Sequence, residues 1–342
     1  MIDIGPGTFQ SWECTSSNVT LRGSGRDKTI IKGGTQGFGV EINQGCTDLT
    51  VQDLTVDNAN GFWGVTIPNI AAKTSWTNVE IMGGIYGWVE WVTSSCANHD
   101  GKHLFFSSRI ISTGAVVNNN TSRAYTATCA QSWFWGSEIT SQAPSAMTNM
   151  FALEAHGAEV HLYGSNVRLL LPNGSAAASY IPGSPSSGNS HYMIAALNSS
   201  AIHIHGTGLD VVHPGTGTAD MLYADSTSHF HANESAFNMH VSGAGKVRRI
   251  GGAGSIEAPY AWKQGSTPPL STKLDGTPTL NGVTTLISVN GADSYIETDC
   301  PVSGNCSVGG TFPHQMVYRG ECTNTTVNGG PWFDLTTKDC RK

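Results

Sequence analysis

A repeat of about 28 residues runs along most of this chain and limits the folds that it can adopt. Short β-rich runs recur from Val40 to Val241, with little helical periodicity between them. The interval between Val167 and Leu209 contains a Gly/Ser/Pro/Ala-rich insert over residues 172–190, which is typical of a surface loop. One inward position per repeat gives spacings of 25, 31, 29, 28, 42 and 28 residues, for Leu54, Val79, Ile110, Ile139, Val167, Leu209 and Phe237. A period of about 20–50 residues is typical of solenoids and propellers.

Each repeat carries about three short strands separated by tight polar turns, as in Val40–Asn43, Leu49–Gln52 and Leu54–Asp57. Alternation along each strand places one row of side chains inside and the other outside. A propeller needs four strands per blade joined as hairpins, and the hairpin turn signals are not evident. The repeat therefore predicts an all-β chain folded as a parallel β-helix.

The N-terminal region resembles a known superfamily. Ile4–Phe9, Val19–Gly25 and Thr29–Gly33, followed by Phe38–Ile42 and Cys46–Val51, are similar to the opening coils of the pectin-lyase-like right-handed parallel β-helices. The resemblance covers roughly residues 1–260 and implies a right-handed, single-stranded β-helix. The superfamily includes lyases, hydrolases, esterases, epimerases and non-catalytic fibres, and the motifs of pectate lyases, polygalacturonases and pectin methylesterases are missing here. The resemblance therefore implies a fold and leaves the activity open.

The repeat also predicts the domain organisation. We expect a parallel β-helix over residues 1–258, a Pro/Thr-rich strap or linker over 259–280, and a cysteine-rich cap or small module over 281–342. Open solenoid ends need caps because they expose unpaired edges and core. Eight cysteines without a CxxC pair indicate disulfides rather than a zinc ribbon. The simplest pairings are Cys14–Cys46, Cys96–Cys129, Cys300–Cys306 and Cys322–Cys340.

The composition of the chain limits the cellular compartment and the kinds of binding partner that we expect. Only 13% of the residues are charged and the formal net charge is −7, so a basic nucleic-acid-binding face is not expected. No segment has the length and apolar character of a membrane span. Met1–Ile4 already reads as a strand, so we expect that a signal peptide was removed or lies outside this sequence. These features favour a secreted, extracellular or periplasmic protein.

Alignment of the repeats predicts two outward columns of rings on the middle strands. With Phe134, Leu162, Ile204 and Ala232 pointing inward, the neighbours on either side point outward in successive coils. Flat rings suit the apolar faces of sugars, while imidazole and amide groups supply hydrogen bonds. The predicted substrate-binding residues are Phe106, Trp133, Trp135, His203, His205, His231 and Asn233. Burial of this face under a loop or the tail, or in a homo-oligomer, is the alternative.

The same columns predict an alternative role in metal binding. His203 and His205 project together from one strand, and His231 or His161 from a neighbouring coil would complete a three-histidine site for a divalent metal. Imidazole stacks in β-solenoids need no metal, so the metal is an expectation and not a requirement. A gap at one turn would replace His231 with His229.

Three glutamates lie on the predicted strands that follow the longest loops. By alternation Glu41 and Glu90 are expected to point outward, with Glu154 in the same column. Glu41 and Glu90 are two coils apart, as are Glu90 and Glu154, which predicts separations of about 10 Å. Inverting glycosidases hold their acid and base about 6.5–9.5 Å apart. Glu90 with Glu41 or Glu154 is thus the predicted acid–base pair for hydrolysis, and solvated glutamates are the alternative.

For β-elimination, His161 and Tyr163 are the candidate bases and Arg168 the charge stabiliser. A simple Arg168–Asp210 salt bridge between coils is the alternative role of Arg168. The sequence as a whole favours a secreted enzyme that cleaves a polysaccharide by glycosidic hydrolysis or β-elimination. The rival functions are a non-catalytic carbohydrate-binding adhesin or structural fibre, and a His-rich metal-binding solenoid.

Overall fold

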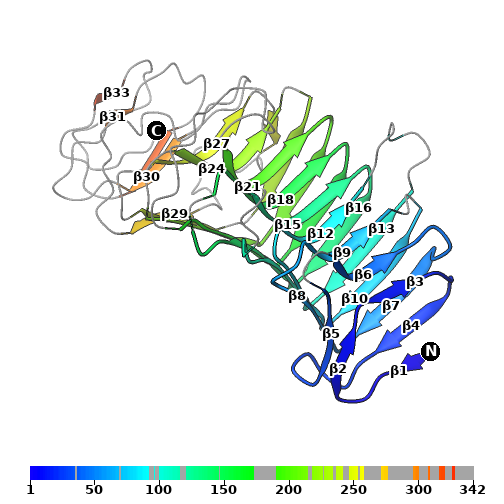
Figure 1. Cartoon of the computed structure of the whole chain (residues 1–342). Helices are drawn as coiled ribbons and strands as arrows, with labels where there is room; N and C mark the ends of the chain where they lie inside the picture. The colour runs from blue at the N-terminus through cyan, green and yellow to red at the C-terminus, as the bar shows by residue number, and fades with distance from the viewer. Residues whose placement is uncertain are drawn as a thin grey trace.

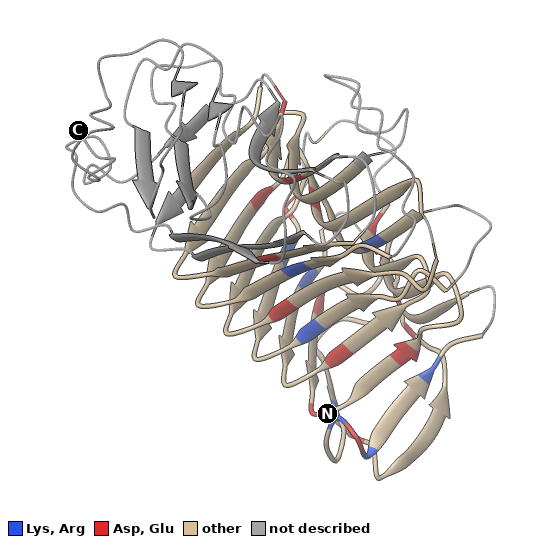
Figure 2. Cartoon of the chain, turned by 90° about the vertical axis from the view of Figure 1, so that its left-hand side faces the viewer, with Lys and Arg blue, Asp and Glu red and all other residues tan. Residues whose placement is uncertain are grey.

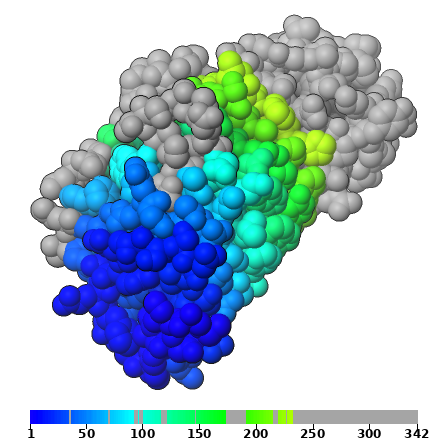
Figure 3. Space-filling model, turned by 90° about the vertical axis from the view of Figure 1, so that its right-hand side faces the viewer, coloured from blue at the N-terminus to red at the C-terminus, as the bar shows by residue number. Residues whose placement is uncertain are grey.

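Each repeat folds into one coil of a parallel β-helix, and each coil gives one strand to each of three long sheets (Figure 1). In this computed structural model, residues 1–231 are described except 35–36, 69–70, 92–95, 97–99, 116–120, 146, 173–189, 215–217 and 226. Beyond residue 231, only the backbone of the strands named below is described. The predicted parallel β-helix is confirmed, and successive coils follow one another along an elongated body (Figure 3).

The strands of each sheet pair in parallel, one coil apart. The first sheet contains β1 (Ile2–Asp3), β4 (Val19–Arg22), β7 (Asp48–Gln52), β10 (Lys73–Thr77), β13 (Lys102–Phe106), β16 (Gln131–Trp135), β19 (Glu159–Tyr163), β22 (Ala201–His205), β25 (His229–Asn233) and β28 (Ser255–Glu257). The second sheet contains β2 (Gly7–Gln10), β5 (Thr29–Lys32), β8 (Thr55–Asn58), β11 (Glu80–Gly83), β14 (Arg109–Ser112), β17 (Glu138–Gln142), β20 (Asn166–Leu170), β23 (Gly208–His213), β26 (Ala236–Val241) and β29 (Ser271–Asp275). The third sheet contains β3 (Trp12–Cys14), β6 (Phe38–Ile42), β9 (Trp63–Ile67), β12 (Tyr86–Glu90), β15 (Thr121–Thr128), β18 (Asn149–His156), β21 (Ser190–Leu197), β24 (Thr218–Ala224) and β27 (Lys246–Gly252).

Strand β29 joins the second sheet beside β26, within the stretch that the sequence assigns to a strap or linker. Further along, β30 (Ile296–Asp299) pairs with β32 (Met316–Arg319), and β31 (Ser307–Val308) pairs with β33 (Thr326–Val327). The described part of the chain contains no helix with the length and apolar character needed to cross a membrane.

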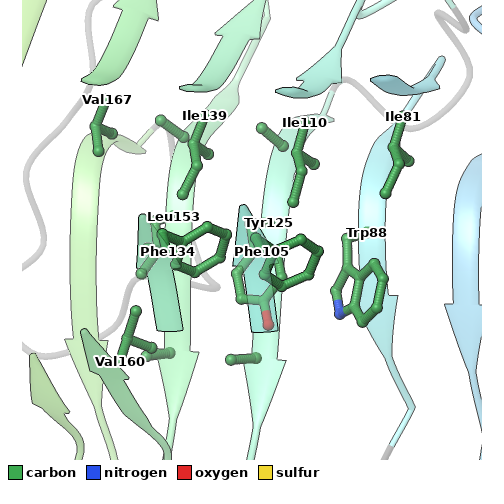
Figure 4. Packing of buried hydrophobic residues seen from close by; sticks show 14 of the residues in the cluster. Ile81, Trp88, Phe105, Ile110, Tyr125, Phe134, Ile139, Leu153, Val160 and Val167 are labelled. Atoms are coloured by element: carbon green, nitrogen blue, oxygen red, sulfur yellow. The ribbon is translucent and has the colours of Figure 1, made fainter. Parts of the chain in front are cut away.

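Rows of apolar side chains fill the interior because alternate residues of every strand point inward. In the first sheet, Phe105 stacks on Phe134 with ring centroids 4.6 Å apart, and both are fully buried. Trp88 and Tyr125 of the third sheet pack against Phe105, so the three sheets share one core (Figure 4). The core therefore runs along the whole described solenoid and holds neighbouring coils in register.

Among the described side chains, the inward positions chosen from sequence are correct in all but two coils, and the side chain of Phe237 lies outside the described part. Ile110, Ile139, Val167, Leu209 and Phe237 pair with one another in successive strands of the second sheet. The same row continues through Ile81 and Val56, so Val79 and Leu54 lie two residues earlier, at buried turn positions. The spacing of 31 residues in the sequence analysis thus becomes 29 in the structure.

The turn between the first and second sheets uses one left-handed residue in each of six successive coils. Its φ lies between 48° and 55°, where glycine and asparagine are least strained. The residues are Asp53, Asn78, Ser107, Gly136, Gly164 and Gly206. A buried hydroxyl follows this residue in the later coils, as at Ser137, which donates to the carbonyl of Phe105 in the preceding coil. The turn therefore stays tight without leaving its polar groups unpaired.

Two of the predicted disulfides are confirmed. Cys14–Cys46 and Cys96–Cys129 each join neighbouring coils, across 32 and 33 residues of sequence. The expected Cys300–Cys306 and Cys322–Cys340 pairs lie outside the described residues.

Replacing Cys14 and Cys46 together with Ala should lower the free energy of unfolding by about 2–4 kcal/mol, because the bridge restricts the unfolded chain. Chemical denaturation of the oxidised protein and of the double variant measures this difference. An equal midpoint for the two proteins would contradict a stabilising role for the bridge.

Charged residues alternate across the outer face of the second sheet (Figure 2). Arg109 lies between Glu80 and Glu138, with nitrogen–oxygen distances of 2.5 and 3.2 Å. Arg168 Nε lies 3.3 Å from Asp210 Oδ2, which confirms the predicted cross-coil salt bridge. Because these pairs are solvent-exposed, each is expected to contribute little to stability.

Candidate functional site

The two outward columns of rings on the first sheet lie in the predicted register. Trp133, His161, His203 and His231 face one another on β16, β19, β22 and β25. The parallel column consists of Phe106, Trp135, Tyr163, His205 and Asn233. His231 and not His229 is opposite His203, so the gap that would shift the last coil is absent. We call these two columns the ring ladder.

Rings of the ring ladder stack face to face along the solenoid. Trp133 and His161 are 5.3 Å apart with 4° between their planes, and His161 and His203 are 4.4 Å apart with 7°. Trp135 and Tyr163 stack in the same way at 5.9 Å. The ring faces are therefore taken up by neighbouring rings, and a sugar would meet ring edges along most of the ladder. This geometry does not favour the predicted stacking of sugars on these residues.

One part of the ladder gathers groups that are able to bind a cation. Glu159 Oε1 lies 2.9 Å from His161 Nε2 and 3.9 Å from His203 Nε2. Burial and the neighbouring imidazoles lower the pKa of His203 to about 4. Burial would raise the pKa of Glu159, but hydrogen bonds from His161 and Gln131 outweigh it and lower that pKa. Histidine binds metals as a neutral imidazole and glutamate binds them as a carboxylate, so both groups are in their metal-binding forms.

The predicted acid–base pairs of glutamates are not formed. Glu41 and Glu154 share one outward row of the third sheet, but four strand steps separate them, or about 19 Å. Glu90 lies one position off this row and points into the core, so its expected outward direction is wrong. The reason is register, since Val89 and not Glu90 takes the position equivalent to Glu41.

Glu90 belongs to a buried polar network. Its carboxyl accepts hydrogen bonds from the Thr128 backbone nitrogen at 2.7 Å and from Trp88 Nε1 at 3.3 Å. His103 Nε2 lies 3.3 Å from the same carboxyl, and His103 Nδ1 bonds to Thr74. Burial raises the pKa of Glu90 to about 8, although the hydrogen bonds act in the opposite direction. At neutral pH, Glu90 is therefore mostly protonated.

The outer face of the third sheet carries a pocket of about 410 Å³, which we call the third-sheet pocket. Trp91, at 44% one of the most exposed large apolar side chains described, stands at its edge. The ring of Trp91 meets Tyr86 and Trp63 edge to face, at 6.0 and 5.7 Å. Polar residues along the pocket wall are Glu90, Arg123, Thr126, Thr128, His156 and Asn198. An exposed aromatic ring beside several hydrogen-bonding groups is typical of a sugar-binding site.

A buried carboxylate organises the wall of the third-sheet pocket. Glu154 is 3% exposed and accepts from Arg123 Nη1 at 2.5 Å, while His156 Nε2 lies 3.1 Å away on its other oxygen. The guanidinium of Arg123 also lies over the rings of Tyr86 and Phe151. Burial would raise the pKa of Glu154, but Arg123 and His156 outweigh it and lower that pKa. Glu154 is thus a charged anchor that orients a cation and an imidazole.

The pocket also has hydrogen-bonding capacity that no described residue uses. Arg123 Nε and Thr126 Oγ1 are buried without a hydrogen-bond partner among the described residues, and both residues line the pocket. His156 Nδ1 lies 3.2 Å from the amide nitrogen of the exposed Asn198. A ligand in the pocket would reach His156 Nδ1 by displacing the Asn198 side-chain amide, and a small side-chain shift would bring Arg123 Nε or Thr126 Oγ1 within its reach.

The sequence pattern does not single out Tyr86, Trp91, Arg123 and His156, and it groups Arg168 with His161 and Tyr163. Arg168 projects from the second sheet and pairs with Asp210, whereas His161 and Tyr163 belong to the first sheet. One signal could have located the third-sheet column, because an aromatic residue precedes glycine at Phe38, Trp63 and Tyr86. The next coil continues this column with Arg123 before an alanine.

Fold and site together define a disulfide-linked parallel β-helix protein with a ring ladder on one sheet and a pocket on another. No protein family matches the sequence, and a search among curated proteins finds no similar one. Among solved structures, the chain is similar to the A-module of the mannuronan C-5 epimerase AlgE4 from Azotobacter vinelandii. The match has 13% identity and a TM-score of 0.32, and it covers 81% of this chain and 89% of that one.

Proposed function

We propose that this chain is a secreted enzyme that cleaves a uronic-acid-containing polysaccharide by β-elimination in the third-sheet pocket. The observation that carries the proposal is the Arg123–Glu154–His156 arrangement beside the exposed ring of Trp91. Arginine recognises carboxylates through paired hydrogen bonds, and Trp91 offers a ring to a sugar. The two disulfides support the oxidising compartment that secretion provides.

In this mechanism, each group of the pocket has a separate task. Arg123 binds the uronate carboxylate and disperses the charge that develops when the adjacent C5 proton leaves. His156, held by Glu154, accepts that proton on Nδ1 after the substrate displaces the Asn198 amide. The C5–H electron pair forms the C4–C5 double bond, and the C4–O bond breaks. Tyr86 protonates the leaving oxygen, since burial raises its pKa and keeps the hydroxyl protonated.

Elimination is favoured over hydrolysis by the placement of the carboxylates. Hydrolysis needs two carboxyl groups about 5–9.5 Å apart across the scissile bond. Glu41 lies about 19 Å from Glu154, and Glu90 points into the core. Glu154 is moreover occupied by Arg123 and His156. None of the three predicted glutamates is therefore placed as half of an acid–base pair.

The test measures reducing-end release and absorbance near 235 nm together on a panel of neutral and uronic-acid polysaccharides. We expect both signals to rise together on uronic-acid substrates only. His156→Asn should lower kcat by about 100-fold or more, because it removes the base. Trp91→Ala should raise KM by about two- to tenfold, through loss of a stacking contact.

His161→Asn is the matched control, because His161 lies on the first sheet and outside the pocket. Its activity should equal that of the unaltered chain. Dependence on His161 in place of His156 would move the reaction to the ring ladder and contradict the proposal. Reducing ends without absorbance would indicate hydrolysis. Binding without any turnover across the panel would support the non-catalytic alternative.

A further inference from the structure

We infer that Glu159, His161 and His203 form a binding site for a divalent transition-metal ion of the zinc class on the outer face of the first sheet. Glu159 and His161 are two residues apart on β19 and share one face, and His203 lies opposite His161 on β22. One ligand atom from each residue lies within 4.8 Å of the other two. Zinc bonds of about 2.0–2.2 Å place tetrahedral ligand atoms roughly 3.4 Å apart, so the three atoms need to move only slightly closer. Because the rings of His161 and His203 are nearly parallel, one imidazole must also turn out of the stack so that both lone pairs point at the ion.

Neighbouring residues hold the three ligands in a binding orientation. Gln131 Nε2 donates to Glu159 Oε2 at 2.9 Å, which leaves Oε1 directed at the imidazoles. Tyr163 OH lies 3.3 Å from His161 Nδ1 and can accept the Nδ1 proton, so Nε2 can exchange its contact with Glu159 Oε1 for a bond to the ion. The ring of His161 is also stacked between Trp133 and His203. A second hydrogen bond of this kind on a ligating histidine fixes its tautomer and raises metal affinity.

The donor set indicates the class of metal. Two imidazoles with one carboxylate suit zinc and related ions, whereas calcium and magnesium require mainly oxygen ligands. His161 and His203 are 14% and 26% exposed, so an ion from solvent can reach them. Three protein ligands leave a fourth position for water, or for His231, whose ring centroid is 5.8 Å from that of His203. This site differs from the expected set, His203 and His205 completed by His231 or His161, because Glu159 takes the place of His205.

The test titrates untagged, chelator-treated protein with zinc chloride alone in a calorimeter, with magnesium chloride as the comparison ion. We expect about one zinc ion per chain and no measurable magnesium binding. Glu159→Gln and His203→Gln should each weaken zinc affinity by at least about tenfold. Tyr163→Phe should weaken it to a smaller extent, because it removes only the hydrogen bond to His161.

His205→Gln is the matched control, because His205 belongs to the same ring ladder but to the other column. Its zinc affinity should stay within about twofold of the unaltered chain. Loss of binding in His205→Gln with retention in Glu159→Gln would overturn the assignment, as would equal weak binding by every variant. Visible spectra of the cobalt-loaded protein give a second readout, in which tetrahedral bands should vanish in Glu159→Gln. Thermal melting of each variant distinguishes the loss of a metal ligand from the loss of folding. A failure to bind zinc would leave the proposed function of the third-sheet pocket unaffected.

Discussion

Replacing Arg123 with Met is expected to lower the free energy of unfolding by about 3–5 kcal/mol at pH 7. The substitution keeps a chain of similar length between Tyr86 and Phe151 but removes the partner of Glu154. Glu154 is only 3% exposed and would keep just His156 beside its carboxylate. A buried carboxylate without a compensating charge is among the most destabilising single defects in a protein. Urea denaturation followed by circular dichroism measures the loss.

Two matched variants separate this electrostatic cause from a packing defect. Arg123→Met combined with Glu154→Gln should recover much of the lost stability, because no charge is then left unpaired. Arg22→Met breaks the exposed pair with Asp3 and should cost less than about 1 kcal/mol. The cost of Arg123→Met should also shrink as the pH falls below 4.5, because the unfolded chain then protonates Glu154 and the stability from its charge is lost progressively down to the lowered pKa of the folded chain. A double variant as unstable as Arg123→Met alone would show that packing dominates.

Period and alternation were sufficient to predict the coil, the three strands per coil and the two ring columns. The reason is that a parallel β-helix repeats one residue environment at every strand spacing, so apolar residues must recur at equivalent positions. Cys14 and Cys46 lie one repeat apart, and the same holds for Cys96 and Cys129, so the repeat also placed both confirmed disulfides between neighbouring coils.

The candidate site was harder to predict, because one residue of register decides which face a side chain takes. Gly87 and Trp88 both face the core, as Gly39 and Val40 do in the earlier coil, so strict alternation counted from Gly87 fails. An alignment of Trp88 with Gly39 is shifted by one residue and turns Glu90 outward. The correct alignment of the coils follows a row of small residues that includes Gly39 and Gly87. The buried Trp88 directly after Gly87 makes this row hard to recognise in the sequence.

The orientation of the outward rings is a second property that the alternation of residues along a strand does not predict. Alternation predicts that Trp133 and His161 point outward, and they do. Neighbouring strands are about 4.8 Å apart, which is close to the contact distance of parallel rings. Rings in successive coils therefore stack on one another, and their faces are not open to a ligand. A row of outward rings therefore indicates a stacked ladder in this fold, and an exposed ring without a face-to-face partner, such as Trp91, is the better indicator of a sugar platform.

The buried Glu90 gives the second prediction with a large effect, a loss of stability as pH rises. The folded chain holds the Glu90 proton up to pH about 8, whereas the unfolded chain releases it near the ordinary pKa of 4.5. Folding therefore takes up a proton between these values, and stability falls by about 1.4 kcal/mol per pH unit across that window. The contribution is fully present below pH 4.5 and lost above pH 8, with a total of up to about 5 kcal/mol.

Glu90→Gln tests this coupling, because a glutamine amide resembles the protonated carboxyl in shape and cannot ionise. At pH 5 the variant should be within about 1 kcal/mol of the unaltered chain, and at pH 9 it should be the more stable of the two. Denaturation curves at both values measure the change of sign. Glu41→Gln is the control, since Glu41 is on the same sheet but largely solvated, and its curves should stay nearly parallel to those of the unaltered chain. A Glu90→Gln variant that is less stable at both pH values would mean that Glu90 is buried as a charged partner of His103.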